Sequence, residues 1–174
     1  MNRNSLVART ALLSGLVVLA GCSKEIDFSL PATFNVNSAG TPATYNYVQQ
    51  IDLAAQAPDA WSHKDKVKDL SLVDVEGTVL SMSTSATTGS GTLWLRPDTA
   101  TNSSQDVQVA TYTNQPIAMG QSVIITLVPA ALTIVNNALQ GDGKFKVVAS
   151  GTTAAAAIFT VEITLHMKLN YKII

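Results

Sequence analysis

The chain has 174 residues, with 11 Lys or Arg against 12 Asp or Glu and a formal net charge of −1 at pH 7. This balance argues against a nucleic-acid-binding protein, which needs a basic face. The chain has one cysteine, so a disulfide within it is excluded and the fold must depend on its hydrophobic core. Ser, Thr, Val and Ala are frequent, which favours strands and polar turns over long exposed helices.

The N-terminal segment has the features of a secretory signal peptide. Arg3 and Arg9 form a short positive segment, and the apolar run at residues 11–20 is well below the roughly 20 residues that span a bilayer. An Ala-Gly pair then supplies the small residues that a signal peptidase needs, and Cys22 follows directly. We therefore expect a signal peptide over residues 1–21, which is cleaved on export, rather than a transmembrane helix.

The sequence Leu19-Ala20-Gly21-Cys22 resembles the lipobox of bacterial lipoprotein precursors, which signal peptidase II cleaves. The resemblance implies a diacylglyceryl group on the sulfur of Cys22, cleavage before this residue and, often, acylation of its new amine. Two or three acyl chains make release from a membrane negligible, whereas one chain binds with an association constant of only about 10⁴ M⁻¹. The alternative, a buried cysteine, is not expected at the end of a signal segment.

Cleavage removes 21 of the 174 residues and leaves 153, with 9 basic and 12 acidic side chains and a formal charge of −3. We expect a short lipidated tether at residues 22–25, which reaches about 10 Å, and a single domain at residues 26–174. Ser23, rather than Asp, follows the cysteine, and the resemblance to lipoproteins of double-membrane bacteria then implies delivery to the outer membrane, in either leaflet. We expect no polybasic patch that would supplement the anchor.

Short segments of alternating apolar and polar residues follow the anchor. We expect strands at residues 26–30 and 33–37, which Pro31 separates, and a third strand at residues 45–53. The next strand begins at Leu70, but its apolar residues change parity at Val73 and again at Leu80, which predicts a β-bulge. Further strands are expected at residues 92–95, 107–113, 122–128 and 144–148, with polar loops at residues 81–91 and 98–106.

The last strand gives the strongest periodic signal. Every second residue from Phe159 to Ile173 is apolar, and the residues between them, from Thr160 to Lys172, are polar. One face of this strand therefore lies in a core and the other in water. A fully extended segment of this length would reach about 50 Å, so we expect a bend or a bulge within it.

Two helices are expected. Pro129 suits a first helical turn, Leu132, Val135 and Leu139 share one face, and the Gly-Asp-Gly sequence at residues 141–143 ends the helix. The second helix would cover residues 58–70, although its charged second half is equally compatible with a loop. About nine short strands and these helices predict an all-β fold, an antiparallel two-sheet β-sandwich of immunoglobulin-like proportions.

Few residues suit catalysis. A Ser-His-Asp triad needs a histidine base, and the chain has His63 and His166. His166 lies on the polar face of the last strand with only Glu162 as a nearby acid, so we interpret it as a solvated residue. His63 lies among three aspartates, but the lysines between them would repel a cation, and the spacing matches no calcium or zinc motif.

Asp74 and Glu76 share a strand face and are a candidate acid–base pair, yet adjacent carboxylates are routine on exposed sheet faces. Five aromatic residues are candidates for a carbohydrate platform, although a core or sheet-face position is the stronger interpretation for each: Trp61, Trp94, Tyr45, Tyr47 and Tyr112.

We therefore expect no catalytic residue, no cofactor and no metal site, and we interpret the chain as an envelope lipoprotein that is lipidated at Cys22. Its domain would bind or scaffold an unknown envelope protein or glycan without catalysis. The alternatives are an envelope hydrolase with an acidic site that sequence spacing does not reveal, and a carbohydrate-binding adhesion module.

Overall fold

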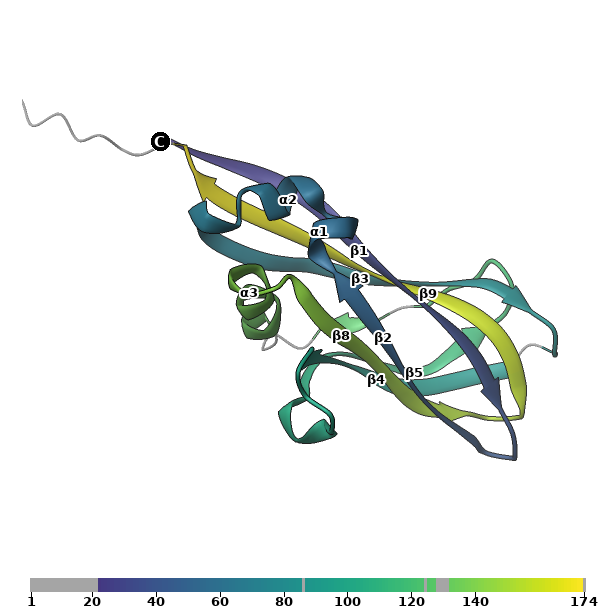
Figure 1. Ribbon diagram of the computed structural model, residues 1–174. Coiled ribbons are helices and arrows are strands. Elements are labelled where there is room, and N and C mark those ends of the chain that lie inside the picture. The colour runs from purple at the N-terminus through teal and green to yellow at the C-terminus, as the bar shows by residue number, and fades with distance from the viewer. Residues whose placement is uncertain (1–21, 86, 124, 128–131, 174) are drawn as a thin grey trace, which may run out of the picture.

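The computed structural model describes residues 22–173, except residues 86, 124 and 128–131. The predicted signal peptide and Pro129 therefore lie outside the described residues. The described chain forms two packed antiparallel sheets (Figure 1), which confirms the predicted all-β sandwich. In spatial order, one sheet contains β1 (Ser23–Ser38), β9 (Ala157–Lys172), β3 (Val67–Met82) and β6 (Ser122–Val123). The other contains β2 (Ala43–Asp52), β8 (Lys144–Thr153), β4 (Thr87–Pro97), β5 (Val107–Ile117) and β7 (Thr126–Leu127).

Strand β9 is central in the four-stranded sheet, and its alternation reports burial as the sequence predicts. Its apolar residues from Phe159 to Leu169 are buried, whereas the residues between them are partly exposed. The strand pairs with β1 in one continuous register from Ser23 to Ser38 and follows a curved path (Figure 1). The expected bend is therefore present, but a bulge within β9 is not, because the register shifts lie on the neighbouring strand β3.

The bulges in β3 explain its changes of parity. The register with β9 shifts between Leu72 and Asp74 and between Val79 and Ser81, so Val73 and Leu80 are the extra residues. Both side chains are exposed, at 52% and 50%. Because successive side chains of a strand point to opposite faces, each extra residue shifts the parity of β3 by one. The apolar residues that follow it therefore point to the core again, although β9 alternates strictly. The predicted bulge is confirmed, and a third shift follows Val67.

Pro31 does not end a strand, and the prediction of two separate strands at residues 26–37 is wrong. Pro31 pairs with Thr164 in the middle of β1, which lies at the edge of its sheet. An edge strand has N–H groups that need no partner, so it tolerates a proline.

The glycines of residues 89–91 lie inside β4, although the sequence predicts a loop there. A Cβ atom on Gly91 would lie 2.5 Å from the hydroxyl of Tyr112, and one on Gly151 in β8 would lie 2.5 Å from the hydroxyl of Tyr45. The two hydroxyls are hydrogen-bonded to each other across these glycines. The glycines are therefore required for close approach within a sheet rather than for a turn.

The helices differ in part from the prediction. Helix α3 (Leu132–Gln140) is confirmed, but the helix expected at residues 58–70 is only α2 (Pro58–Ser62), a 3₁₀ turn η1 (Lys64–Lys66) and the start of β3. Residue Leu53 begins α1 (Leu53–Gln56) instead of ending a strand, because the carboxylate of Asp52 accepts hydrogen bonds from two N–H groups of that helix. The polar segment 98–106 is a loop that contains the 3₁₀ turn η2 (Ser103–Gln105).

The segment expected as one strand at residues 122–128 instead joins the two sheets. Its first part, β6, pairs with β3, and its second part, β7, pairs with β5. Gly77 of β3 lies opposite Val123, where a Cβ atom would be 3.1 Å from that side chain. The small residue allows the crossing segment to lie close to β3.

The two ends of the sandwich are built differently (Figure 1). At one end, short connections carry the chain from one sheet to the other, including those at residues 39–42, 118–121 and 154–156. At the other end lie α1, α2 and α3, whose apolar side chains are buried in the core, including Leu53, Ala60, Val135 and Leu139. This helical end also holds Cys22, whose carbonyl accepts a hydrogen bond of 2.9 Å from the N–H of Ile173.

Candidate functional site

The expected anchor lies directly against the folded domain. Cys22 is exposed, and β1 begins at Ser23, so residues 23–25, which the sequence predicts as a tether, pair with β9. In the described part of the chain, from residue 22 onward with its short gaps, no helix is long and apolar enough to cross a membrane.

A serine, a histidine and two carboxylates meet on the outer face of the four-stranded sheet. The Oγ of Ser29 in β1 lies 2.9 Å from Nδ1 of His166 in β9. The Nε2 of His166 lies 3.7 Å from a carboxylate oxygen of Asp74 and 3.6 Å from one of Glu76, both in β3. Sequence spacing found only Glu162 near His166, because these partners come from two other strands that the register brings alongside.

This cluster does not have the geometry of a catalytic triad. The contacts to the carboxylates are longer than a hydrogen bond, and the side chains of Asp74 and Glu76 are 60% and 56% exposed. Strand β9 is hydrogen-bonded on both sides, so the backbone N–H groups beside His166 are engaged in the sheet and do not form an oxyanion hole. A hollow of about 280 Å³ adjoins Ser29 and His166, and the arrangement is a solvated polar network.

The second histidine has a structural role. The Nδ1 of His63 lies 2.9 Å from the carbonyl oxygen of Asp59 and 2.9 Å from the hydroxyl of Ser62. Its ring packs against Tyr171, with the ring centroids 4.0 Å apart. Within the residues that the structure describes, no three His, Cys, Asp or Glu side chains are grouped so that they could hold a metal ion.

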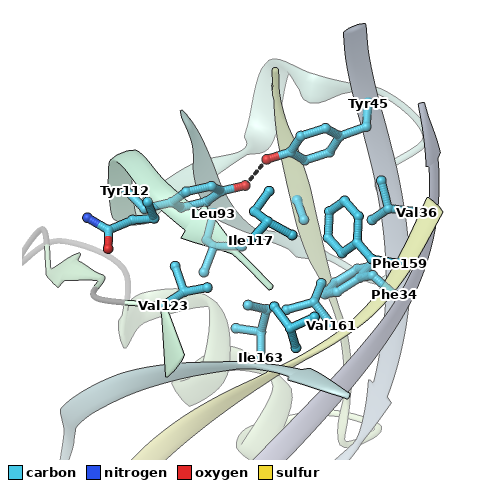
Figure 2. A pocket seen from close by; sticks show the side chains of 13 residues that line it. Phe34, Val36, Tyr45, Leu93, Tyr112, Ile117, Val123, Phe159, Val161 and Ile163 are labelled. Carbon is cyan, nitrogen blue, oxygen red and sulfur yellow. Dashed lines mark hydrogen bonds between the residues drawn. The ribbon is translucent and has the colours of Figure 1, made fainter. Parts of the chain in front are cut away.

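An apolar cavity lies between the sheets (Figure 2). Phe34 and Val161 line it from one sheet and Leu93 from the other, and the hydrogen-bonded hydroxyls of Tyr45 and Tyr112 lie at one end. Burial raises the pKa of both tyrosines. The cavity volume is about 30 Å³, far below the roughly 300–1,000 Å³ of ligand sites. It is therefore a small packing gap in the core and not a binding site.

The outer face of the five-stranded sheet carries a larger hollow of about 350 Å³ around Trp94. Trp94 lies opposite Val148, whose side chain is buried although it points away from the core cluster. The residues that line this hollow come from β2, β8, β4 and the segment that contains η2: Asn46, Trp94, Arg96, Ser103, Asp106, Val148 and Ser150. We call this site the Trp94 hollow.

The polar groups of the Trp94 hollow fall into two kinds. Arg96 and Asp106 form a two-bond ion pair, with N–O distances of 2.6 and 2.8 Å, and their side chains are 12% and 8% exposed. The hydrogen bond to Asp106 raises the pKa of Arg96. In contrast, the side chains of Trp94, Asn46, Ser103 and Ser150 make no hydrogen bond to any residue of the described chain. The hollow thus combines a rigid wall with donors and acceptors that a ligand can reach.

The other candidate aromatic residues lie elsewhere. Tyr45 is in the core, while Tyr47, Trp61 and Tyr112 are partly buried and pack against it. The predicted core or sheet-face position thus holds for all five residues: four lie in or against the core, and Trp94 is on the outer face of a sheet. The sequence gives no signal for Asn46, Ser103 or Ser150, because isolated polar residues of separate strands become neighbours only through pairing.

Neither a protein-family model nor a curated protein matches the chain. Among solved structures, the chain is similar to one described as Desmodium yellow mottle tymovirus, with 14% identity and a TM-score of 0.35 over 100% of this chain and 98% of that chain. It is also similar to a structure of turnip yellow mosaic virus, with 12% identity and a TM-score of 0.34 over 87% of this chain and 96% of that chain. Scores of this size carry no inference about activity or partners.

Proposed function

We propose that the mature chain is an envelope lipoprotein, anchored through acyl chains on Cys22 in the outer membrane, whose domain binds a ligand without catalysis. The lipobox-like sequence supports the anchor, and the exposed position of Cys22 at the start of β1 is compatible with acylation. The observation that carries the binding role is the Trp94 hollow, where a partly buried indole and three polar side chains lack partners within the described chain.

A sugar ring is the ligand class that fits the Trp94 hollow best. The flat face of an indole packs against the apolar face of a pyranose, and polar side chains around it can bond the ring hydroxyls. The charges in the hollow are balanced, because Arg96 is paired with Asp106. We therefore favour a neutral glycan unit, which makes carbohydrate adhesion the specific form of the binding role.

Replacing Cys22 by Ser tests the anchor. The wild type should pellet with membranes and incorporate a labelled fatty acid, whereas Cys22→Ser should stay an unprocessed precursor or be released. A Cys22→Ser protein that is both cleaved and membrane-bound would refute the anchor. Ser23→Asp is the matched control for sorting: it should stay acylated but move from the outer-membrane to the inner-membrane fraction of a density gradient. Wild type in the inner-membrane fraction would contradict the sorting proposal.

Titration with neutral oligosaccharides tests the hollow. Cellotriose, maltotriose and triacetylchitotriose are added to the acylated protein in a detergent without a sugar headgroup, and heat is measured. Trp94→Ala should weaken any binding at least tenfold, about 1.4 kcal/mol. Thr44→Ala on the same sheet face, outside the hollow, should leave it unchanged. Wild-type protein that binds none of the three sugars, or equal binding by Trp94→Ala, would contradict this site.

The contacts of His166 favour hydrolysis as the second candidate function, because Ser29 and two carboxylates surround it. The absence of an oxyanion hole around His166 makes this candidate weaker. Ester hydrolysis that disappears in Ser29→Ala while the fold is retained would support it over the non-catalytic role.

A further inference from the structure

Five lysines that are distant in sequence gather at the end of the molecule that holds Cys22. Lys24 pairs with Tyr171, and Lys172 pairs with Ser23. Val67 also pairs with Tyr171, and Lys68 is the extra residue of the bulge that follows it. The His63 ring packs on Tyr171 and places the η1 turn, which contains Lys64 and Lys66, beside the same residue. We call Lys24, Lys64, Lys66, Lys68 and Lys172 the lysine cluster.

Most charges of the lysine cluster are not neutralised by the protein. Lys24, Lys66, Lys68 and Lys172 are exposed and form no ion pair with any residue of the described chain. Lys64 contacts Asp65 at 3.4 Å and lies 5.0 Å from the ring centroid of Trp61.

The acidic side chains at this end are fewer than the lysines, and some of them already form ion pairs. Asp65 contacts Lys64, and Glu25 and Asp27 lie 2.8 and 3.8 Å from Lys168. Asp59 and Asp69 are the carboxylates of this end without an ion pair in the described chain, against the four unpaired lysines. The end is therefore positive, although the chain from residue 22 onward carries a formal charge of −3.

The position of the cluster points to its partner. Lys24 is two residues from Cys22, a span of about 7 Å, and Lys172 pairs with the residue next to Cys22. Acyl chains on Cys22 would hold these lysines within a Debye length, about 8 Å, of lipid headgroups. A lysine near an anionic surface strengthens binding about fivefold.

We propose that the lysine cluster binds the headgroups of anionic phospholipids and seats on the membrane the end of the four-stranded sheet that holds Cys22, where β1 begins and β9 ends. This contact rests on the proposed anchor at Cys22. The contact directs the opposite end of the domain, which holds the short inter-sheet connections, away from the bilayer. The sequence predicts no polybasic patch that would supplement the anchor, whereas the fold brings lysines from separate segments to one end of the sheet.

Lysine acetylation in vesicles tests the contact. The acylated protein is reconstituted in vesicles of phosphatidylcholine, or of phosphatidylcholine with phosphatidylglycerol, and an amine-reactive acetyl ester is added. With phosphatidylglycerol, acetylation of Lys24, Lys66, Lys68 and Lys172 should slow about fivefold, and high salt should restore it. Lys144, on the five-stranded sheet, is the internal control and should react equally in both vesicles.

Charge reversal separates this contact from anchoring. Lys66→Glu with Lys68→Glu should pellet with both vesicles but lose the protection of Lys24 and Lys172, whereas Lys144→Glu should keep it. Equal acetylation of wild type in both vesicles, with full pelleting, would overturn the lipid contact and leave the anchor intact. Failure of the wild type to pellet with either vesicle would overturn the anchor and the contact together.

Discussion

The outer faces of the two sheets follow the same alternation and yet differ in chemistry. On the four-stranded sheet, the residues around His166 are mostly polar and solvated, the exposed Val73 of the bulge excepted, and the ion pairs are exposed. On the five-stranded sheet, Val148 and Trp94 form an apolar floor, and the ion pair of Arg96 and Asp106 is nearly buried beside it. The acids and the histidine around His166 are therefore weaker evidence for a ligand site than Trp94 with its unpaired polar neighbours. The Trp94 hollow offers a ligand an apolar surface that it can cover, whereas the surroundings of His166 are solvated.

Substitutions at two adjacent residues of β9 test whether the loss of stability depends on the face of the sheet, core or solvent, on which a residue lies. Leu165→Asp would place an unpaired carboxylate in the core and should lower the free energy of unfolding by several kcal/mol, enough to unfold an ordinary domain. His166→Asp should cost less than about 1 kcal/mol, even with Asp74 and Glu76 nearby, because the site is solvated. Urea unfolding of both variants measures the difference. Equal tolerance would contradict the register of β9.

The ion pairs of the two faces should differ in strength. Arg96→Ala leaves the carboxylate of Asp106 almost buried without its partner and should cost roughly 3 kcal/mol. Lys168 bonds Glu25, which raises the pKa of Lys168, but this pair is on the surface. Lys168→Gln should therefore leave the melting temperature within experimental error. A larger loss of stability from Lys168→Gln than from Arg96→Ala would contradict the claim that the buried ion pair stabilises the fold more than the exposed one.

The inner face of the five-stranded sheet carries the hydrogen-bonded pair Tyr45 and Tyr112. This pair should make the free energy of unfolding decrease at alkaline pH. Burial raises the pKa of both hydroxyls above the ordinary value of 10.0, so the folded protein keeps them neutral when the unfolded chain ionises. Their contribution should be complete below pH 10 and should be lost as the pH rises above it. Thermal melts from pH 8 to 11 measure this decline.

Variants at the tyrosine pair provide the controls for the alkaline decline. Tyr45→Phe leaves the hydroxyl of Tyr112 without its partner and should cost about 1–3 kcal/mol at neutral pH. Replacing both tyrosines by Phe should flatten the pH dependence. A double variant that loses stability above pH 10 as steeply as the wild type would show that other groups cause the decline.

The prediction of the fold from the sequence succeeded where local pattern and burial agree. The alternation of β9, the changes of parity in β3 and the apolar face of α3 each report one buried surface, so periodicity alone identifies them. The prediction failed where a residue has two uses. Pro31 can end a strand or occupy an edge, and Gly91 can form a turn or admit a tyrosine hydroxyl. The choice depends on neighbours from other strands.

The sequence by itself determined the all-β class and the core face of the last strand, because these follow from side-chain order along the chain. It also carries the lipobox-like motif, on which the proposed anchor rests. Only the tertiary structure decided which polar residues become neighbours: Ser29 with His166, Asn46 and Ser103 with Trp94, and Lys24 with Lys68 and Lys172. The fold brings these residues together from segments that are distant in sequence, and no spacing within one segment encodes their proximity.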